Sequence, residues 1–516
     1  MISRRSFARR LSRGAALLVG LAAGLLALRA PLAADEAPKR PNIVFILADD
    51  LGYGDLGCYG QKHTKTPNLD RLAADGMRFT QYYAGSAVCA PSRCVLLTGR
   101  HPGHAFIRSN SDPGPASTPH EIRGQIPLPA DARTLADQLK TLGYATAGFG
   151  KWGLGGPGST GDPLRHGFDH FLGYLDQYHA HNHYPRFIFH DGQQLPLDNP
   201  AIPLHQKLPE DAKPDDPASY RRFVGHDYVP DRLAEAALRF IDEHAGEPFF
   251  LYYPTTIPHM AMQVPEDSLA EYQGQWPDPP YPGGHGYSPH VAPRAAYAAM
   301  ITRMDRDIGR LLASLADHHL AEQTIVVFTS DNGAQGGAVG GGDVDFFQSA
   351  GSLRGLKGSL YEGGVRVPCI VRWTGHVPAG VTSDFVVGAE DWFPTLLDLV
   401  GEKDRLPAGL DGIDIAPTLL GQKQPPRPFL YREFPDGGGQ QSVRIGNWKA
   451  IRAHLMPGGK QGAANLKIQL YDLATDASET HDVAREHPDL VAEAERVFAA
   501  EHSPSAEFPS PALDPK

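Results

Sequence analysis

The strongest constraint on the fold of this chain comes from four apolar segments that each lead into polar residues. They are residues 42–48, 145–149, 249–253 and 324–329. Near-continuous apolar runs of this length are typical of strands in a sheet that is buried on both faces. Helices are predicted between the strands, at residues 133–142, 232–244 and 297–315. The alternation of strands and helices predicts an α/β fold, with a mostly parallel sheet flanked by helices.

Polar side chains stand where these strands end. Asp49 and Asp50 follow the first strand, Lys151 follows the second, and Asp331 and Asn332 follow the fourth. Ligands of open parallel sheets gather at the carboxyl ends of the strands, so these side chains are predicted to share one edge. Carboxylate and amide oxygens favour Ca²⁺ or Mg²⁺ over zinc, and adjacent acids repel each other without a cation. The alternative for the two adjacent acids alone is a turn or a helix cap.

At about residue 425 the alternation of apolar strands and helices gives way to short strands with turns between them, which predicts a second domain. Residues 35–424 would form the larger domain and residues 425–516 a smaller α+β domain. Short strands are predicted at residues 428–433, 441–453 and 468–472, and a helix that opens with Pro488 runs to about residue 500. The tail after Ser503 is expected to be poorly ordered.

Residues 1–34 are predicted to be an export signal. Ser3-Arg4-Arg5-Ser6-Phe7 has a twin-arginine pattern, and the apolar run at residues 14–28 is short for a membrane span. An uncleaved membrane anchor is the alternative. A twin-arginine signal is an address read by a receptor. We therefore expect the twin-arginine export machinery as a partner and a periplasmic or secreted protein.

The net charge and the cysteine content narrow the classes of protein to which this chain could belong. The formal net charge of −11 disfavours a general nucleic-acid binder, so no nucleic-acid partner is expected. An anionic substrate remains compatible, because a local cluster of cations can outweigh distant charge. Four cysteines in 516 residues do not make a disulfide framework.

A twelve-residue motif carries the most specific functional information. It reads Cys89-Ala90-Pro91-Ser92-Arg93-Cys94-Val95-Leu96-Leu97-Thr98-Gly99-Arg100. Pro91 fits the first turn of a helix, which places Cys89 at a helix N-terminus. An unmodified cysteine there is expected to be an activated thiolate. The alternative is an ordinary buried cysteine at the start of a helix.

This motif resembles the activation signature of the type I sulfatases, within the alkaline phosphatase superfamily. The similarity runs from Pro41 to about Pro368 and implies an alkaline-phosphatase-like sheet. It also implies that a formylglycine-generating enzyme oxidises Cys89 to formylglycine, which works as a hydrate. In that chemistry one hydroxyl attacks sulfur and the alcohol leaves. Loss of the second hydroxyl proton then reforms the aldehyde and expels sulfate.

The resemblance also implies roles for individual residues. The metal ligands would be Asp49, Asp50, Asp331, Asn332 and the hydrate oxygen of residue 89, which starts as Cys89. Arg93 would stabilise the hydrate and the sulfate, and Lys151 would bridge them. His259 would contact the leaving-group oxygen, and Lys357 would be a second sulfate-binding lysine. The metal would be Ca²⁺, with Mg²⁺ as the alternative.

One position departs from the family pattern. Many members have a histidine two residues after the first lysine, as the base that triggers sulfate release, and this chain has Gly153. The candidates to replace that base are His101, His104, His179, His181 and His183. Each of them could equally be a loop or core imidazole.

The sequence therefore predicts an exported sulfatase, whose substrate is a sulfated saccharide rather than a small aryl sulfate. Residues 178–184, 108–110 and 432–433 could recognise a sugar, although such residues also suit ordinary loops. Two alternatives remain open. One is a phosphodiesterase or phosphonate monoester hydrolase of the same superfamily. The other is a secreted carbohydrate-binding protein in which Cys89 is never converted.

Overall fold

The computed structural model describes residues 40–111, 119–456 and 464–514, which belong to one compact unit. The predicted export signal at residues 1–34 lies outside the described residues. Within the described ranges, no helix has the length and apolar character needed to cross a membrane.

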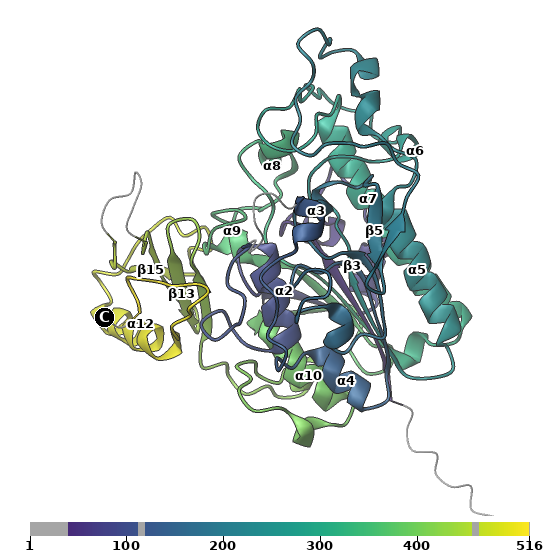
Figure 1. Cartoon of the computed structure of the whole chain (residues 1–516). Helices are drawn as coiled ribbons and strands as arrows, with labels where there is room; N and C mark the ends of the chain where they lie inside the picture. Colours follow the sequence, from purple (N-terminus) through teal and green to yellow (C-terminus); the bar gives the residue numbers. More distant parts are fainter. Residues whose placement is uncertain (1–39, 112–118, 457–463, 515–516) are drawn as a thin grey trace, which may run out of the picture. The chain divides into compact units, whose positions relative to one another are not determined.

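A large, mostly parallel sheet forms the core of the chain (Figure 1). Ten of its strands follow the order β10 (Val381–Ser383), β2 (Met77–Tyr83), β9 (Arg366–Arg372), β8 (Thr324–Ser330), β1 (Asn42–Ala48), β7 (Phe249–Pro254), β3 (Ala145–Lys151), β4 (His170–Tyr174), β5 (Phe187–His190) and β6 (Gln193–Pro196). The eleventh strand, β11 (Val387–Gly388), pairs with β2. The five central strands β8, β1, β7, β3 and β4 are parallel to one another, which confirms the predicted fold class.

Helices cover both faces of this sheet because alternate side chains of each strand point to opposite sides. In β1, Val44, Ile46 and Ala48 join one buried apolar cluster, and Ile43, Phe45 and Leu47 join the other. The first cluster includes α1 (Pro67–Ala74), α5 (Val229–Glu243) and α7 (Pro293–Asp317). The second includes α2 (Cys89–Thr98), α4 (Leu135–Thr141) and α10 (Trp392–Leu399).

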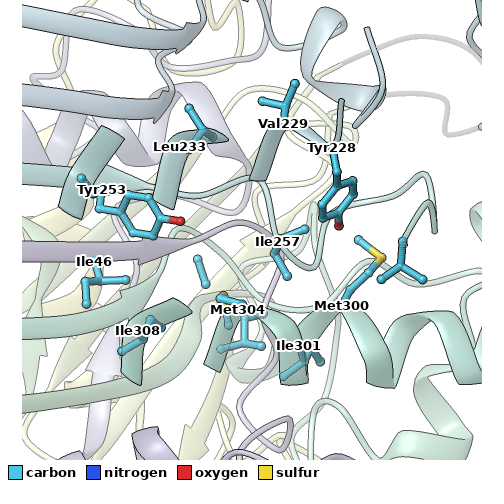
Figure 2. Close-up of a cluster of buried hydrophobic side chains, with 14 of the residues drawn as sticks. Ile46, Tyr228, Val229, Leu233, Tyr253, Ile257, Met300, Ile301, Met304 and Ile308 are labelled. Carbon is cyan, nitrogen blue, oxygen red and sulfur yellow. The ribbon is translucent and has the colours of Figure 1, made fainter. Parts of the chain in front are cut away.

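The packing of α5 and α7 on the sheet shows how this core is held together (Figure 2). Ile301 and Ile308 of α7 and Leu233 of α5 have no exposed surface. Burial of an aliphatic side chain of this size stabilises the fold by about 1.5–3 kcal/mol. The predicted helical stripe that begins at Tyr297 is therefore the buried face of a longer helix. Short helices complete the chain: α3 (His120–Arg123), α6 (Glu266–Leu269), α8 (Val344–Phe347), α9 (Glu362–Val365) and α11 (Ala416–Leu419).

A second, antiparallel sheet lies near the C-terminus. It consists of β12 (Leu430–Phe434), β13 (Gln440–Ile445), β14 (Trp448–Ala453) and β15 (Gln469–Asp472), and α12 (Pro488–Glu501) packs against it. The prediction of one strand over residues 441–453 is wrong, because Gly446 adopts a φ of +56° and turns the chain into a hairpin. The predicted domain boundary at residue 425 stays a prediction.

The C-terminal tail also differs from expectation, because residues 503–514 pack on the protein. Phe508 is buried as a member of the second apolar cluster, and the Ser503 N–H donates to the carbonyl of Gly103. His502 lies 3.1 Å from Asp514. A buried aromatic side chain and these polar contacts hold the segment, and a composition-based view of the tail misses them.

Buried ion pairs join the second sheet to the rest of the chain. Arg432 is paired through both guanidinium arms with Glu390, at 2.9 Å for each contact. Glu433 is also buried and accepts from Tyr431 and Gln441. The prediction that Arg432 and Glu433 bind a sugar is therefore wrong, because both side chains are saturated inside the structure.

Candidate active site

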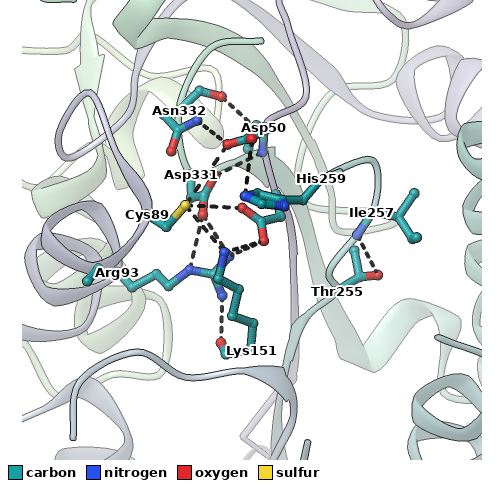
Figure 3. Close-up of polar contacts among 12 residues, drawn as sticks. Asp50, Cys89, Arg93, Lys151, Thr255, Ile257, His259, Asp331 and Asn332 are labelled. Carbon is teal, nitrogen blue, oxygen red and sulfur yellow. Dashed lines mark hydrogen bonds and ion pairs between the residues drawn. The ribbon is translucent and has the colours of Figure 1, made fainter. Parts of the chain in front are cut away.

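The ends of three parallel strands bring the predicted site residues to one place (Figure 3). Asp49 and Asp50 follow β1, Lys151 ends β3, and Asp331 follows β8. The β1 strand lies between β7 and β8, and β3 pairs with the other side of β7. Each of these four side chains is at most 2% exposed. The parallel register is what makes sequence-distant acids and lysine meet.

Helix α2 delivers Cys89 to the same place. Cys89 is the first residue of α2, and every residue of the helix is buried. The preceding residue, Val88, provides no side-chain cap, and the Ala90 N–H donates instead to the Asn110 side-chain oxygen, at 2.8 Å. Asn110 thus satisfies one of the free N–H groups that every helix N-terminus carries. The packing of α2 fixes the position of the sulfur.

The Cys89 sulfur lies among charged groups. Its Sγ is 3.3 Å from Asp49 Oδ1 and 3.4 Å from Lys151 Nζ. Lys151 Nζ also donates to Asp49 Oδ2 at 2.6 Å. Asp50 Oδ1 lies 4.0 Å from the sulfur. An oxygen nucleophile in place of this sulfur would therefore have a cation and two carboxylates as immediate neighbours.

The expectation of an activated thiolate is wrong. Burial raises the pKa of the Cys89 thiol far above its ordinary value, and the Asp49 carboxylate raises it further, although Lys151 opposes both effects. The partial positive charge of a helix N-terminus is small beside the cost of burying an anion next to a carboxylate. The unmodified cysteine is a neutral thiol in this setting.

Arg93 connects the site to two strand ends. Its guanidinium donates twice to Asp331 Oδ2, at 3.1 and 2.6 Å, and once to the carbonyl of Lys151, at 2.5 Å. It also lies 3.7 Å from Asp49 Oδ2. The side chain is completely buried and fully engaged, so its positive charge is held in a fixed position.

Lys357 and His259 approach Asp50 from another direction. Lys357 Nζ is 2.8 and 2.9 Å from the two Asp50 oxygens, and its side chain is 11% exposed. His259 Nε2 is 3.5 Å from Asp50 Oδ2, and its Nδ1 lies 2.5 Å from the carbonyl of Met260. Burial and the positive charge of Lys151 hold the pKa of His259 well below its ordinary value. His259 is therefore a neutral imidazole whose Nε2 faces the acids.

The residues present fit a hard divalent cation. Asp49, Asp50, Cys89 and His259 each offer a ligand atom, and these atoms lie within 4.8 Å of one another. The Asn332 Nδ2 donates to Asp50, at 2.7 Å, and its Oδ1 is buried without a hydrogen-bond partner among the described residues. A buried amide oxygen left without a partner is costly, and a cation would satisfy it.

Asp331 is placed differently from the other predicted ligands. Its Oδ2 accepts both bonds from Arg93, and its Oδ1 accepts from the Asp50 N–H, at 3.1 Å. Burial and the charge of Asp49 raise the pKa of Asp331 to about 6. The predicted ligand roles of Asp331 and Asn332, and the catalytic roles of the cations, stay predictions on this geometry.

The five candidate histidines do not share one location. His101 and His104 stack on each other and contact Asp411, and His101 also contacts Glu501, so both are part of the contact with α12. His181 stacks on His259 with ring centroids 4.8 Å apart. His179 and His183 are buried, and burial lowers the pKa of both imidazoles. Only His181 touches a residue that contacts the predicted metal ligands.

Gly153 is explained by its neighbour Gln177. Gly153 has a φ of +79°, and a Cβ atom at this position would lie 1.6 Å from the Gln177 Nε2. A histidine at 153 would therefore collide with Gln177 and require a left-handed backbone conformation. Gln177 carries no motif, and only the distance to Gly153 draws attention to it.

An aromatic wall borders His259, and we define it as Tyr178, His181, His205 and Tyr287. His181 lies edge-on to Tyr287, with centroids 4.9 Å apart. His205 stacks on both Tyr178 and Tyr287, at 4.8 Å in each case. Tyr178 and His181 belong to the aromatic-rich segment at residues 178–184, but His205 and Tyr287 come from other loops without a motif.

Comparison with known proteins agrees with this site. The sulfatase family profile matches residues 41–402. Human arylsulfatase A is 36% identical over 456 residues, which cover 84% of this chain and 77% of that protein. The N-acetylgalactosamine-6-sulfatase of Canis lupus familiaris is 33% identical over 434 residues, covering 82% and 73%.

The fold comparison gives the same result. The structure of Ps i-CgsB in complex with k-i-k-neocarrahexaose matches with a TM-score of 0.70 and 27% identity, over 90% of this chain and 92% of that one. The profile match covers more than half of the sequence and includes every predicted site residue. The chain therefore belongs to the sulfatase family and is a sulfuric ester hydrolase.

Proposed function

We propose that this sulfatase cleaves the sulfate ester of a sulfated saccharide, with Cys89 converted to formylglycine and a bound divalent cation, Ca²⁺ or alternatively Mg²⁺. The observation that carries the proposal is the position of the Cys89 sulfur, 3.4 Å from Lys151 Nζ and 3.3 Å from Asp49 Oδ1. A group at residue 89 is thus held where a cation and a carboxylate can control its protonation.

Three buried cations support sulfate as the group that is transferred. Arg93, Lys151 and Lys357 surround the acids, and their positions are fixed by bonds to Asp331, Asp49 and Asp50. Preorganised positive charge stabilises the negative charge that develops when an S–O bond breaks. Lys357 is the most exposed of the three, so we expect it to meet the incoming sulfate first.

Metal binding fits the acids of the site. Asp49, Asp50, Asp331 and the Asn332 oxygen would hold the cation, which would lower the pKa of an attacking hydroxyl and screen charge. All four ligands are oxygens, and this donor set favours Ca²⁺ or Mg²⁺.

The saccharide part of the proposal rests on the aromatic wall and on two relatives. Ring faces beside polar edges suit the faces and hydroxyls of a sugar. One relative is named an N-acetylgalactosamine-6-sulfatase, and Ps i-CgsB was crystallised with a carrahexaose.

We also propose that the protein is exported by the twin-arginine machinery to the periplasm or the exterior. The pattern at residues 3–7 supports this, and that route carries folded proteins. Conversion of Cys89 by a formylglycine-generating enzyme would then precede export.

The test combines mass spectrometry with initial rates. Conversion removes the thiol of Cys89, and the mass of the peptide that contains residue 89 reports it. Rates on 4-nitrophenyl sulfate, bis(4-nitrophenyl) phosphate and a panel of sulfated mono- and oligosaccharides report the reaction. We expect the sulfated saccharides to have the highest kcat/KM. A preference for the phosphodiester by fully converted enzyme would overturn the proposal in favour of the phosphodiesterase alternative.

A further inference from the structure

A second group of side chains that can bind a metal lies at the far end of α2 from Cys89. It consists of His101, His104 and Asp411, whose ligand atoms lie within 4.8 Å of one another, and we call it the α2-end cluster. Cys89 is the first residue of α2 and Thr98 is the last, so about 15 Å of helix separates this cluster from the site at the strand ends. The proposed sulfate chemistry does not use these side chains.

The backbone brings the three side chains of the cluster together. Residues 101–104 form a turn in which the His104 N–H donates to the carbonyl of His101, at 2.9 Å. The Asp411 N–H donates to the carbonyl of Gly99, at 2.9 Å, and the His101 N–H donates to Asp411 Oδ2, at 3.0 Å. The two imidazole rings stack with their centroids 4.4 Å apart. The fold itself therefore holds the two histidines and the acid side by side.

The distances within the cluster suit a tetrahedral zinc ion. His104 Nδ1 lies 2.9 and 3.1 Å from the two Asp411 oxygens, and His101 Nδ1 lies 3.8 Å from Asp411 Oδ2. Zn²⁺ binds nitrogen and oxygen at about 2.0–2.2 Å, which places neighbouring ligand atoms about 3.4 Å apart. The separations in the cluster lie on both sides of this value. Two imidazole nitrogens beside one carboxylate favour Zn²⁺ over Ca²⁺ or Mg²⁺.

Glu501, at the end of α12, orients the ring of His101. Its Oε2 lies 2.9 Å from His101 Nε2, and the Gly103 N–H donates to His101 Nδ1, at 3.2 Å. These contacts assign the ring proton to Nε2 and the lone pair to Nδ1, on the side of Asp411. A histidine that binds a metal commonly donates its other ring N–H to a carboxylate in this way. The Gly103 bond is at the long end of the usual range, and a metal ion would replace it.

The charge and the exposure of the cluster also suit a cation. With neutral imidazoles, Asp411 and Glu501 leave two negative charges at this place. Arg108 is a nearby cation, but its guanidinium is engaged with three backbone carbonyls. The side chain of His104 is 30% exposed, so a metal ion and a water molecule can reach the cluster from solvent.

We propose that His101, His104 and Asp411 bind one Zn²⁺, with a water molecule as the fourth ligand and Glu501 as the outer partner of His101. The ion joins the turn after α2, the segment before α11 and the end of α12. Without the metal, the same residues keep the hydrogen-bonded pair of His104 and Asp411. The inference requires neither the proposed substrate nor the conversion of Cys89, so it can fail while the proposed function stands.

Metal titrations of the purified protein test the site. The protein is stripped with a chelator and then saturated with Ca²⁺, which occupies the acids at the strand ends. Zn²⁺ is titrated by calorimetry, and Co²⁺ serves as a spectroscopic probe, because a Cys89 thiolate ligand would add a charge-transfer band that nitrogen and oxygen ligands do not give. The variants are His104→Gln and Asp411→Asn. The matched control is His318→Gln, since His318 pairs with Asp242 at 2.8 Å and is similarly exposed, at 35%.

We expect one Zn²⁺ per chain in the Ca²⁺-saturated protein. The loss of an outer partner typically weakens metal binding about 10–100-fold, so Glu501→Gln should fall in this range, and the loss of a ligand in His104→Gln or Asp411→Asn should cost more. The His318→Gln control should bind Zn²⁺ as the unchanged protein does. With Zn²⁺ at about a hundredfold its dissociation constant, the melting temperature should rise by about 2–3 °C, and the two ligand variants should lack this rise.

Two results would overturn the zinc site. One is the absence of Zn²⁺ binding by the Ca²⁺-saturated, unchanged protein. The other is Zn²⁺ binding that His104→Gln and Asp411→Asn leave unaltered, together with a thiolate band in the Co²⁺ complex, which would place the metal at Cys89. Circular dichroism of each metal-free variant identifies a folding defect, and if one ligand variant is misfolded the other decides the case.

Discussion

The strand-end site and the contact between the two sheets both bury several charged side chains, but they use them differently. At the contact, Arg432 and Glu390 satisfy each other with two bonds of 2.9 Å. At the site, the Asn332 side-chain oxygen is buried without a hydrogen-bond partner in the described part of the chain. The carboxylates of adjacent Asp49 and Asp50 also repel each other. At the contact between the sheets every charge has its partner, whereas at the strand-end site a bound cation would lower the electrostatic energy further.

This difference shows in the pKa values of the acids. Burial opposes ionisation of Glu390, but Arg432 lowers its pKa below the ordinary value. At the site, burial and the charge of Asp49 raise the pKa of Asp50 despite the contact with Lys357. Buried charges that are fully paired hold a structure together, whereas crowded acids with a raised pKa beside an unpartnered amide oxygen prepare a site for a ligand.

The largest expected effect is on catalysis. Cys89→Ala removes the group that we propose is converted to formylglycine, and we expect turnover to fall by about 10⁴-fold or more. Circular dichroism and the melting temperature should stay close to those of the unchanged protein. The control is Cys94→Ala, because Cys94 is a buried cysteine of the same helix that does not touch the acids. Near-normal activity of Cys89→Ala would end the assignment of the nucleophile.

The next effect should appear in stability at the contact between the sheets. Glu390→Gln leaves the Arg432 charge buried with no carboxylate opposite it, and we expect a loss of about 3–5 kcal/mol in the free energy of unfolding. Urea unfolding measures it. The exposed pair of Asp398 and Lys403 provides the control, because Asp398→Asn should cost less than about 1 kcal/mol. Equal effects of the two substitutions would contradict the view that the contact depends on complete pairing.

A smaller effect is expected for metal affinity. Asp331→Ala removes a predicted ligand and releases Arg93, so we expect the affinity for Ca²⁺ to fall by about 10–100-fold. Calorimetric titration of the metal-free protein measures the affinity. Asp231→Ala is the comparison, because Asp231 pairs with Arg303 away from the strand ends and should leave Ca²⁺ affinity unchanged. Unaltered Ca²⁺ binding by Asp331→Ala would remove Asp331 from the ligand set.

The smallest effect concerns pH. A hydrogen bond to Asp411 raises the pKa of His104 above its ordinary value, although burial opposes this. The protonated pair therefore stabilises the fold fully below the unfolded-state pKa, and this contribution disappears as the pH rises through the folded-state pKa. We expect His104→Gln to cost up to about 1 kcal/mol at pH 5.5 and less at pH 8.5. Urea unfolding at both values checks the direction, and a larger cost at the higher pH would contradict it.

Much of the fold and site could be predicted because the signals are local. Apolar runs fixed the strands β1, β3, β7 and β8, and in a parallel sheet their carboxyl ends must meet at one edge. The placement of Asp49, Lys151 and Asp331 follows from that rule, because each of them stands at the carboxyl end of an apolar strand. The failures came where the deciding partner is distant in sequence. Phe508 holds the tail by joining the second apolar cluster, and Glu390 explains the burial of Arg432.

The sequence by itself determined the chemistry of this protein, because the motif around Cys89 and the acids at the strand ends specify which groups meet. Tertiary structure alone decided the state of those groups and the shape around them. The thiol of Cys89 is neutral because burial and Asp49 outweigh the helix N-terminus, and Gly153 adopts a left-handed backbone conformation with the Gln177 side chain where a Cβ atom would lie. Burial and contact distance arise only when remote segments pack, and no local pattern encodes them.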